Sequence, residues 1–214
     1  KAFVGSLLWP TTQRFAWLAA NFDGLVEDRG FVAAARWIVP QLYSKVRVEA
    51  SAEVPKDGPL LVASNHPGGG DGLLLASLLG RRDLKIVVSG LSILRNLRCT
   101  ARHLIYVPRT GSERMLVIRQ VIRHLREDGA LLIFPSGSVD PDPDVLPGAE
   151  RALERWSPSL GLILRSVPQT QVQLSILSSI VSPEYVGNPL ARLRRELRDR
   201  QKSAEMLQVI QQLY

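Results

Sequence analysis

Residues 59–71 read PLLVASNHPGGGD, and this stretch decides the class of fold that the sequence predicts. Its first part, PLLVAS, is typical of a strand that other elements cover on both faces. Three glycines then allow a tight turn, and Asp71 opens a leucine-rich helix. Because ligand sites in open α/β sheets lie at the carboxyl ends of the strands, the turn after this strand is the candidate site.

The rest of the chain from residue 45 onward repeats the same rhythm of short apolar runs and helical patterns. This alternation predicts an α/β fold with a mixed, largely parallel central sheet flanked by helices. We expect strands at 45–49, 60–64, 85–89, 103–107, 130–134, 161–166 and 172–177. We expect helices at 71–79, 112–127, 147–156 and 189–212.

The N-terminal part of the chain is rich in aromatic residues, since eight of the 13 fall in the first 43 positions. Residues 11–22 and 31–42 read as two helices. They form either a pair that rests on a membrane interface or a hairpin packed on the core, and both interpretations stay open. We therefore expect an N-terminal helical, membrane-interfacial segment at 1–44, an α/β core at 45–188 and a C-terminal helix at 189–214.

The composition suits one soluble domain that attracts an anionic partner, since 214 residues carry a formal charge of +7. The single Cys99 excludes an intramolecular disulfide and a cysteine-based metal cluster, and it favours a reducing, cytoplasmic location. The longest apolar runs are about half of the roughly 18–20 residues that span a bilayer, so membrane contact should be peripheral, on the inner face. Because the chain begins at Lys1, a targeting segment or helix could be missing upstream.

His66 and Asp71 are the candidate catalytic residues of the turn. In a continuous helix, positions five apart point about 140° from each other, so the pair can meet only if the turn brings Asp71 back. Pro67 keeps His66 extended. An aspartate that accepts a hydrogen bond from one imidazole nitrogen fixes the tautomer and leaves the other nitrogen as a base near neutral pH.

A second interpretation of residues 65–71 is a glycine-rich loop before a helix, with His66 and Asp71 on the surface and free amides cradling phosphate. The seven residues alone leave both interpretations open. The segment lacks the GxxxxGK[ST] pattern of a P-loop and the GxGxxG pattern of a dinucleotide fold, which disfavours a nucleotide ligand.

The spacing Asn65-His66-x4-Asp71 resembles the hallmark of the PlsC-like glycerolipid acyltransferases, and three further blocks follow in the family's order. The resemblance covers roughly residues 50–185 and implies the PlsC-like acyltransferase fold. It also implies that His66 acts as the general base, that Asp71 orients it, and that Asn65 belongs to the substrate-binding residues.

The second block, LIYVPR at residues 104–109, is similar to a family strand that ends in a phosphate-binding arginine. The resemblance implies that Arg109 binds the acceptor, and a planar guanidinium suits phosphate oxygens. Residues 146–149, LPGA, resemble the segment that opens the family's next helix. Val167-Pro168, after an expected strand, resembles the family's last block.

The third block, FPSGS at residues 134–138, is similar to the family's Phe-Pro-Glu-Gly-Thr-Arg but departs from it. Ser136 stands where the family carries a glutamate that helps to bind the acceptor, and Val139 or Asp140 stands at the arginine. A serine can donate and accept a hydrogen bond but brings no charge. Ser136, Gly137 and Ser138 are candidate substrate-binding residues, and the acceptor stays open.

The resemblance implies direct transfer of a fatty acyl group from acyl-CoA or an acyl-carrier protein to a hydroxyl of a glycerolipid-type or related acceptor. Backbone N–H groups of Gly68, Gly69 and Gly70 are the candidate donors to the oxyanion. We expect no cofactor, no metal and no covalent intermediate, since the chain has no GxSxG elbow and no metal-ligand spacing joins His103 to His124.

The positive charge and the N-terminal aromatic residues predict binding to an anionic membrane surface through basic and aromatic N-terminal surfaces. A non-catalytic lipid-binding member of the same fold is the main alternative, because the third block lacks its glutamate. A basic nucleic-acid-binding protein is the third possibility. Its aromatic and basic residues do not interleave, so we expect no nucleic-acid partner.

Overall fold

The computed structural model describes the backbone of residues 2–89, 92–108 and 114–213, with side chains from residue 9 onward except at 92, 93 and 114. In this part of the chain, five parallel strands pair in the order β3-β2-β4-β1-β5. They are β1 (Leu60–Ser64), β2 (Lys85–Ser89), β3 (Leu104–Val107), β4 (Ala130–Ile133) and β5 (Gln171–Ser175). The predicted α/β fold is confirmed, and its described sheet is parallel throughout.

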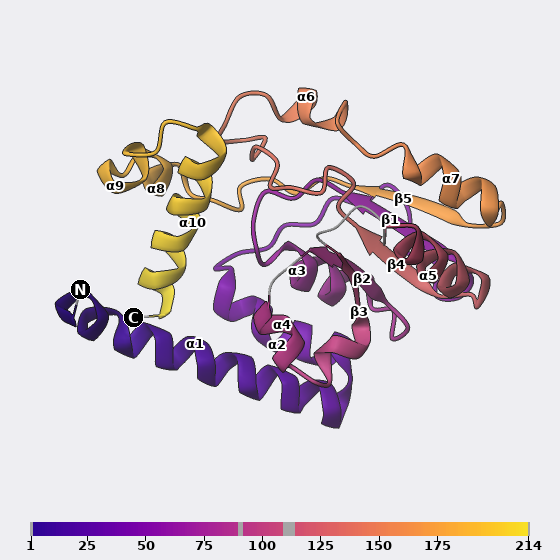
Figure 1. The fold of residues 1–214 in the computed structure, drawn as a ribbon, viewed down its shortest axis with the longest axis horizontal. Coiled ribbons are helices and arrows are strands. Elements are labelled where there is room, and N and C mark those ends of the chain that lie inside the picture. The colour runs from indigo at the N-terminus through magenta and orange to yellow at the C-terminus, as the bar shows by residue number, and fades with distance from the viewer. Residues whose placement is uncertain (1, 90–91, 109–113, 214) are drawn as a thin grey trace.

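Helices surround the sheet and connect its strands (Figure 1). They are α1 (Ala2–Arg29), α2 (Phe31–Leu42), α3 (Asp71–Leu79), α4 (Ser92–Asn96), α5 (Arg114–Arg126), α6 (Ala149–Leu153), α7 (Ser159–Ser166), α8 (Pro183–Gly187), α9 (Pro189–Arg192) and α10 (Leu197–Leu213). A short 3-10 helix, η1 (Thr100–His103), precedes β3.

Strand β1 lies between β4 and the edge strand β5 and is buried along its whole length. Because side chains alternate across a strand, its residues supply two separate cores. Leu60 and Val62 pack in the cluster that holds α1, α2 and α3, whereas Leu61 and Ala63 pack with α5 and α7. The apolar run that predicts this strand is therefore explained by helices on both of its faces.

Two predicted strands are wrong. Residues 45–49 form no strand, because Val46 and Val48 are 39% and 58% exposed and their alternation has no buried face. Residues 161–166 lie in α7, where Ile163 packs inward, and Val167 packs inward four positions later, at the end of the helix. Val167-Pro168 therefore follows a helix rather than a strand. A short apolar run does not distinguish these two structures by periodicity alone.

The helical predictions differ from the structure mainly in their bounds. The predictions at 31–42 and 71–79 match α2 and α3, whereas α1 extends well beyond the predicted 11–22. Residues 189–212 divide into α9 and α10, with residues 193–196 outside either helix. The predicted strand at 103–107 and the predicted helix at 147–156 are present in shorter form as β3 and α6, and the described part of the predicted helix at 112–127 forms α5.

One hydrophobic cluster contains residues from all three predicted segments, including Phe22 of α1, Val62 of β1 and Ala204 of α10. The division at residues 44 and 188 stays a prediction. None of the helices in the described ranges is long and apolar enough to cross a membrane.

Arg81 joins several loops at the end of the sheet where β1, β2 and β4 begin. Its buried guanidinium forms two bonds to the carboxylate of Asp83, at 2.8 and 2.7 Å. It also donates to the carbonyls of Pro55, Gly58 and Asp128. Asp83 in turn accepts the N–H of Ala130, at the start of β4. One ion pair thus fixes the entry points of three neighbouring strands.

Candidate active site

The turn between β1 and α3 brings His66 and Asp71 together. Asp71 Oδ2 lies 3.0 Å from His66 Nδ1 and accepts the N–H of Gly68 at 2.8 Å. The turn therefore folds back as the spacing of the two residues requires. With Nδ1 bonded to the carboxylate, the other ring nitrogen, Nε2, is the one left to act as a base.

Burial dominates the electrostatics of this pair. Asp71 is fully buried and His66 is about one quarter exposed, with side-chain accessibilities of 0% and 26%. Burial raises the pKa of the Asp71 carboxyl, and the hydrogen bond and charge of His66 oppose that rise. The second carboxylate oxygen, Oδ1, has no hydrogen-bond partner. Burial thus makes the charged form of this carboxyl group less favourable than it is in water, and His66 partly offsets that cost.

The third sequence block lies beside His66. The ring of Phe134 stacks on the imidazole, with 4.2 Å between centroids and 22° between planes. Asp140 N donates to His66 O at 2.9 Å, and Asp140 Oδ2 accepts His66 N–H at 3.1 Å. Contacts to both its ring and its backbone therefore fix His66.

Ser136 points to Asp140 as well as to its own turn. Its hydroxyl lies 2.9 Å from Asp140 Oδ2 and 2.8 Å from Ser138 O, while Gly137 adopts a φ of 65°. The carboxylate of Asp140 is 1% exposed, and its Oδ1 has no hydrogen-bond partner. At the position of the family glutamate this chain therefore has a serine bonded to a buried aspartate four residues later. Acceptor binding by Ser136, Gly137 and Ser138 stays a prediction.

Asn65 uses both polar atoms of its side chain to hold the segment after β5. Its Oδ1 accepts the N–H of Leu177 at 2.7 Å, and its Nδ2 donates to Leu177 O at 2.8 Å. These two hydrogen bonds continue the contact between β1 and β5 beyond the ends of the two strands. A role of Asn65 in substrate binding stays a prediction.

Two of the three glycine N–H groups that are predicted as oxyanion donors already donate hydrogen bonds to carboxylates. Gly68 N–H donates to Asp71, and Gly69 N–H donates to Glu205 Oε1 of α10 at 2.5 Å. A Cβ on Gly70 would lie 2.5 Å from the hydroxyl of Tyr43, so this glycine allows a close approach. Burial, together with the nearby carboxylates of Asp71 and Glu205, raises the pKa of the Tyr43 hydroxyl. An oxyanion role of the three glycines stays a prediction.

Two side chains of α10 contact the site although the sequence did not indicate them. Gln201 donates to Pro67 O, and Glu205 accepts from Gly69. Their positions in the sequence carry no motif, because the contacts are side chain to backbone across more than 130 residues. The signal in the sequence is weak: Gln201 and Glu205 are four residues apart, which places them on the same side of a helix.

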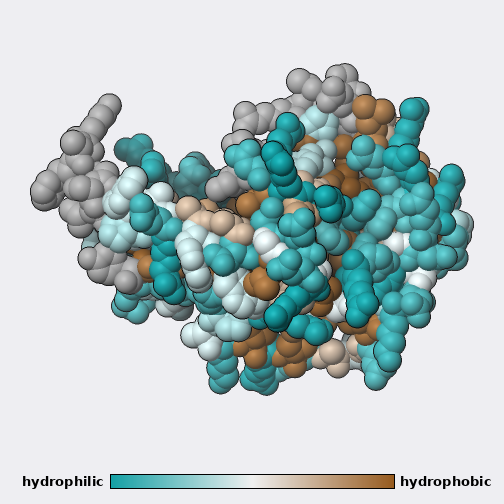
Figure 2. Space-filling model, turned by 90° about the horizontal axis from the view of Figure 1, so that it is seen from below, coloured by the Kyte–Doolittle hydropathy of each residue, from teal (hydrophilic) through white to brown (hydrophobic). Residues whose placement is uncertain are grey.

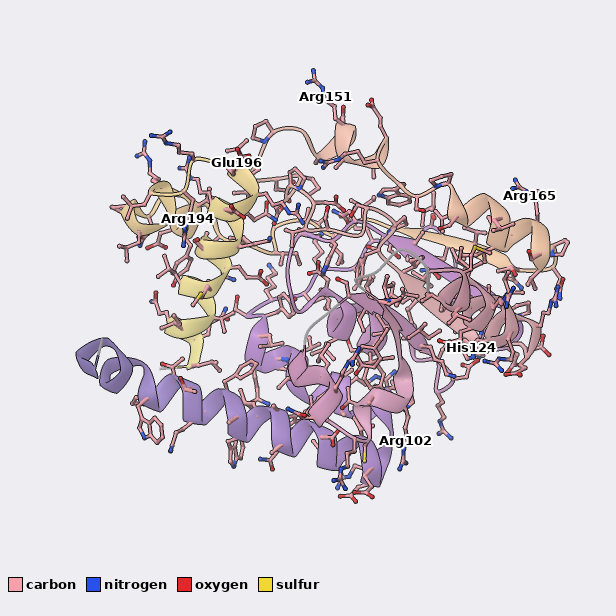
Figure 3. All side chains as sticks on the ribbon, viewed as in Figure 1. Arg102, His124, Arg151, Arg165, Arg194 and Glu196 are labelled. Atoms are coloured by element: carbon pink, nitrogen blue, oxygen red, sulfur yellow. The ribbon has the colours of Figure 1, made fainter. Side chains whose placement is uncertain are left out.

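The two other histidines lie away from this turn. Arg109 lies outside the described residues. His103 stacks on Phe31 with its Nδ1 near Leu84 O, and His124, labelled in Figure 3, has Nε2 2.9 Å from Ala130 O. Within the described ranges, no group of three or more histidine, cysteine, aspartate or glutamate residues is placed to hold a metal ion.

Comparison with known proteins agrees with the motifs and the fold. The family model described as Acyltransferase matches residues 45–161, which is more than half of the 214 residues. The chain belongs to this acyltransferase family, in its PlsC-like form. No solved structure is significantly similar to the chain.

Two curated relatives carry the name lyso-glycine lipid O-acyltransferase. The chain is 34% identical to the protein of Bacteroides thetaiotaomicron over 98 residues, 45% of this chain and 36% of the relative. It is 31% identical to the protein of Phocaeicola vulgatus over 100 residues, 45% of this chain and 35% of the relative. The match thus spans little more than a third of either relative.

Proposed function

We propose that the protein is a lipid O-acyltransferase in which His66 is the general base and Asp71 orients it. The observation that carries this proposal is the 3.0 Å contact between His66 Nδ1 and Asp71 Oδ2. It supports the required tautomer, because Asp71 holds Nδ1 and leaves Nε2 for the acceptor hydroxyl. Membership of the acyltransferase family supports the reaction class.

The reaction is one direct transfer. Nε2 of His66 takes the hydroxyl proton as the acceptor oxygen forms a bond to the thioester carbonyl carbon. The tetrahedral intermediate then loses the thiolate as the carbon–sulfur bond breaks, and the imidazolium returns its proton to that sulfur. Asp71 stabilises the transient imidazolium, and stacking on Phe134 keeps the ring in place. The acyl donor is acyl-CoA or an acyl-carrier protein.

The acceptor we favour is a single-chain lipid that carries a hydroxyl, such as a lyso-glycine lipid. The names of the two relatives support this class. The serine at position 136 supports it too, because the block departs from the glutamate expected for a glycerol phosphate acceptor. Ser136 brings a hydroxyl without a charge to this position, so it fits an acceptor that is recognised by hydrogen bonds.

The N-terminal helix supplies a surface for the lipid phase. On α1, Trp9 and Trp17 are 62% and 53% exposed and Phe15 is also exposed. Arg14 of α1 and Arg36 of α2 are exposed cations of the same helix pair. Figure 2, which views the face on which α1 lies, shows hydrophobic residues in separate patches among hydrophilic ones. This pattern suits shallow, peripheral contact with an anionic membrane.

A thiol-release assay tests the proposal. Acyl-CoA of several chain lengths and acyl-carrier protein are offered with lyso-glycine lipid, lysophosphatidate or glycerol 3-phosphate. We expect release with at least one pair and a loss on the order of 10³-fold or more in His66→Ala, because general base catalysis would be gone. The matched control, His124→Gln, changes a histidine outside the site and should retain transfer.

Undiminished transfer by His66→Ala would overturn the mechanism. Absence of thiol release from every donor and acceptor pair, combined with binding to lipid vesicles, would favour the non-catalytic lipid-binding alternative.

A further inference from the structure

Helix α10, which lies outside the region matched by the family model, reaches the turn that holds the catalytic pair. In Figure 1 it stands to one side of the sheet, in yellow. Gln201 and Glu205 lie one helical turn apart, and their side chains bond to the backbone next to His66 and Asp71.

Gln201 joins the turn after β1 to the loop after β4. Its Nε2 donates to Pro67 O at 2.6 Å and to Asp140 O at 2.9 Å, and its Oε1 accepts Asp142 N–H at 3.2 Å. The side chain is fully buried and both of its N–H donors are used. Replacement by an apolar residue would leave buried carbonyls without partners.

Glu205 holds the same turn three residues after His66. Its Oε1 accepts Gly69 N–H at 2.5 Å, and a Cβ added to Gly68 would lie 2.9 Å from that oxygen. Burial raises the pKa of the Glu205 carboxyl, and the bond from Gly69 opposes that rise. The carboxyl group thus lies directly against the glycine backbone.

The hydrogen bond from Gly69 to Glu205 matters because Gly68, the residue before Gly69, bonds to Asp71. Gly68 N–H donates to the same Asp71 oxygen that meets His66. A movement of the turn would thus displace Gly68 N–H and His66 Nδ1, the two groups that bond to this oxygen, at the same time. In positioned active sites a shift of about 1 Å can lower the rate by about 100-fold.

Resting on the proposed function, we propose that Gln201 and Glu205 are positioning residues: from α10 they hold the glycine turn so that Asp71 meets His66. Glu205 acts as an acceptor for Gly69 and takes no part in proton transfer. The site is then built from two parts of the chain, the family region and a helix beyond it.

Steady-state kinetics separates this role from general support of the fold. We expect Glu205→Ala to lower kcat by about 10–100-fold with the KM of the acyl donor within about threefold. Glu205→Gln should recover most of kcat, because the amide oxygen still accepts from Gly69. Gln201→Met should resemble Glu205→Ala.

Gln208 provides the matched control. It lies on the same helix and bonds to Ser182 N–H and Ile180 O, not to the backbone of the glycine turn. Gln208→Ala removes an anchor of α10 and should lower the melting temperature while kcat changes by less than about threefold. An equal fall of kcat in Gln208→Ala and Glu205→Ala would overturn the proposal, as would wild-type kcat in Glu205→Ala.

A readout without substrate keeps this inference separate from the proposed function. Imidazole ¹⁵N shifts report the tautomer of His66, and Glu205→Ala should lose the single Nδ1–H tautomer that Glu205→Gln keeps. If acyl transfer fails for every substrate, these shifts still decide the positioning role. An unchanged tautomer in Glu205→Ala would refute it.

Discussion

At the scale of single residues, the site depends most on Asp71. Its carboxylate is fully buried, one oxygen takes two hydrogen bonds, and the other oxygen takes none. A buried polar atom without a partner costs free energy of folding and calls for an explanation in function or strain. On the proposed mechanism, the explanation is that the same carboxylate must hold Nδ1 of His66 during acyl transfer.

Asp71→Asn should separate catalysis from stability. It keeps the shape but removes the charge and lets an NH₂ group compete for Nδ1, so kcat should fall on the order of 10²–10⁴-fold. Because burial raises the folded pKa of Asp71, its ionisation costs stability as the pH rises above about 4, the unfolded value. The variant lacks this cost.

Thermal unfolding as a function of pH checks the second part. The melting temperature of Asp71→Asn should equal or exceed that of the wild type at neutral pH, and the difference should shrink as the pH falls toward 4. A less stable variant at neutral pH would contradict this sign.

At the scale of elements, the sequence predicted β1, α2 and α3 to within a residue because Pro59, Gly30 and Gly80 each mark one end of these elements. The failure at 161–166 came from a run short enough to suit a strand or a helix. The pair of His66 and Asp71 was predictable because spacing and a turn signal lie in seven adjacent residues. The contacts of Gln201 and Glu205 were not, since only the folded chain brings them to the turn.

Asp83→Asn tests the ion pair that fixes the starts of the strands. Burial favours the neutral carboxyl, but the bonds and charge of Arg81 outweigh it and lower the pKa of Asp83. The pair is partly exposed, so we expect a loss of about 1 kcal/mol. In a chain of this size that corresponds to about 2–4 °C in melting temperature.

The pH dependence has a definite sign. A lowered folded pKa gives stability that is present above about 4 and is lost as the pH falls through the folded value. The melting temperatures of wild type and Asp83→Asn should therefore differ at pH 7 and converge in acid. A difference that persists unchanged below pH 3 would show that the charge of Asp83 is not its cause.

At the scale of the whole molecule, two kinds of hydrophobic surface lie on opposite layers. Helix α1 packs in the core with α2 yet exposes Trp9, Phe15 and Trp17. Helix α5, which covers the other face of the sheet, exposes Met115 and Leu116. Aromatic rings prefer the headgroup region of a membrane, so only the first surface is suited to it.

Removing the aromatic side chains of α1 should weaken membrane binding. The combined changes Trp9→Ala, Phe15→Ala and Trp17→Ala should lower partition into anionic vesicles by tenfold or more, since each tenfold step needs about 1.4 kcal/mol. Vesicle cosedimentation measures it, with Met115→Ala plus Leu116→Ala as the matched control on α5. Equal losses in both variants would contradict a docking role of α1.

The contact of α10 with the turn also sets an order of events during synthesis. Domains generally form while the chain emerges from the ribosome, beginning at its N-terminal end. A nascent chain that has released residues 1–190 contains the whole motif, the strands and α1, but lacks Gln201 and Glu205. On the positioning proposal, such a chain holds the motif and the strands but reaches its full rate of acyl transfer only when α10 closes on the turn.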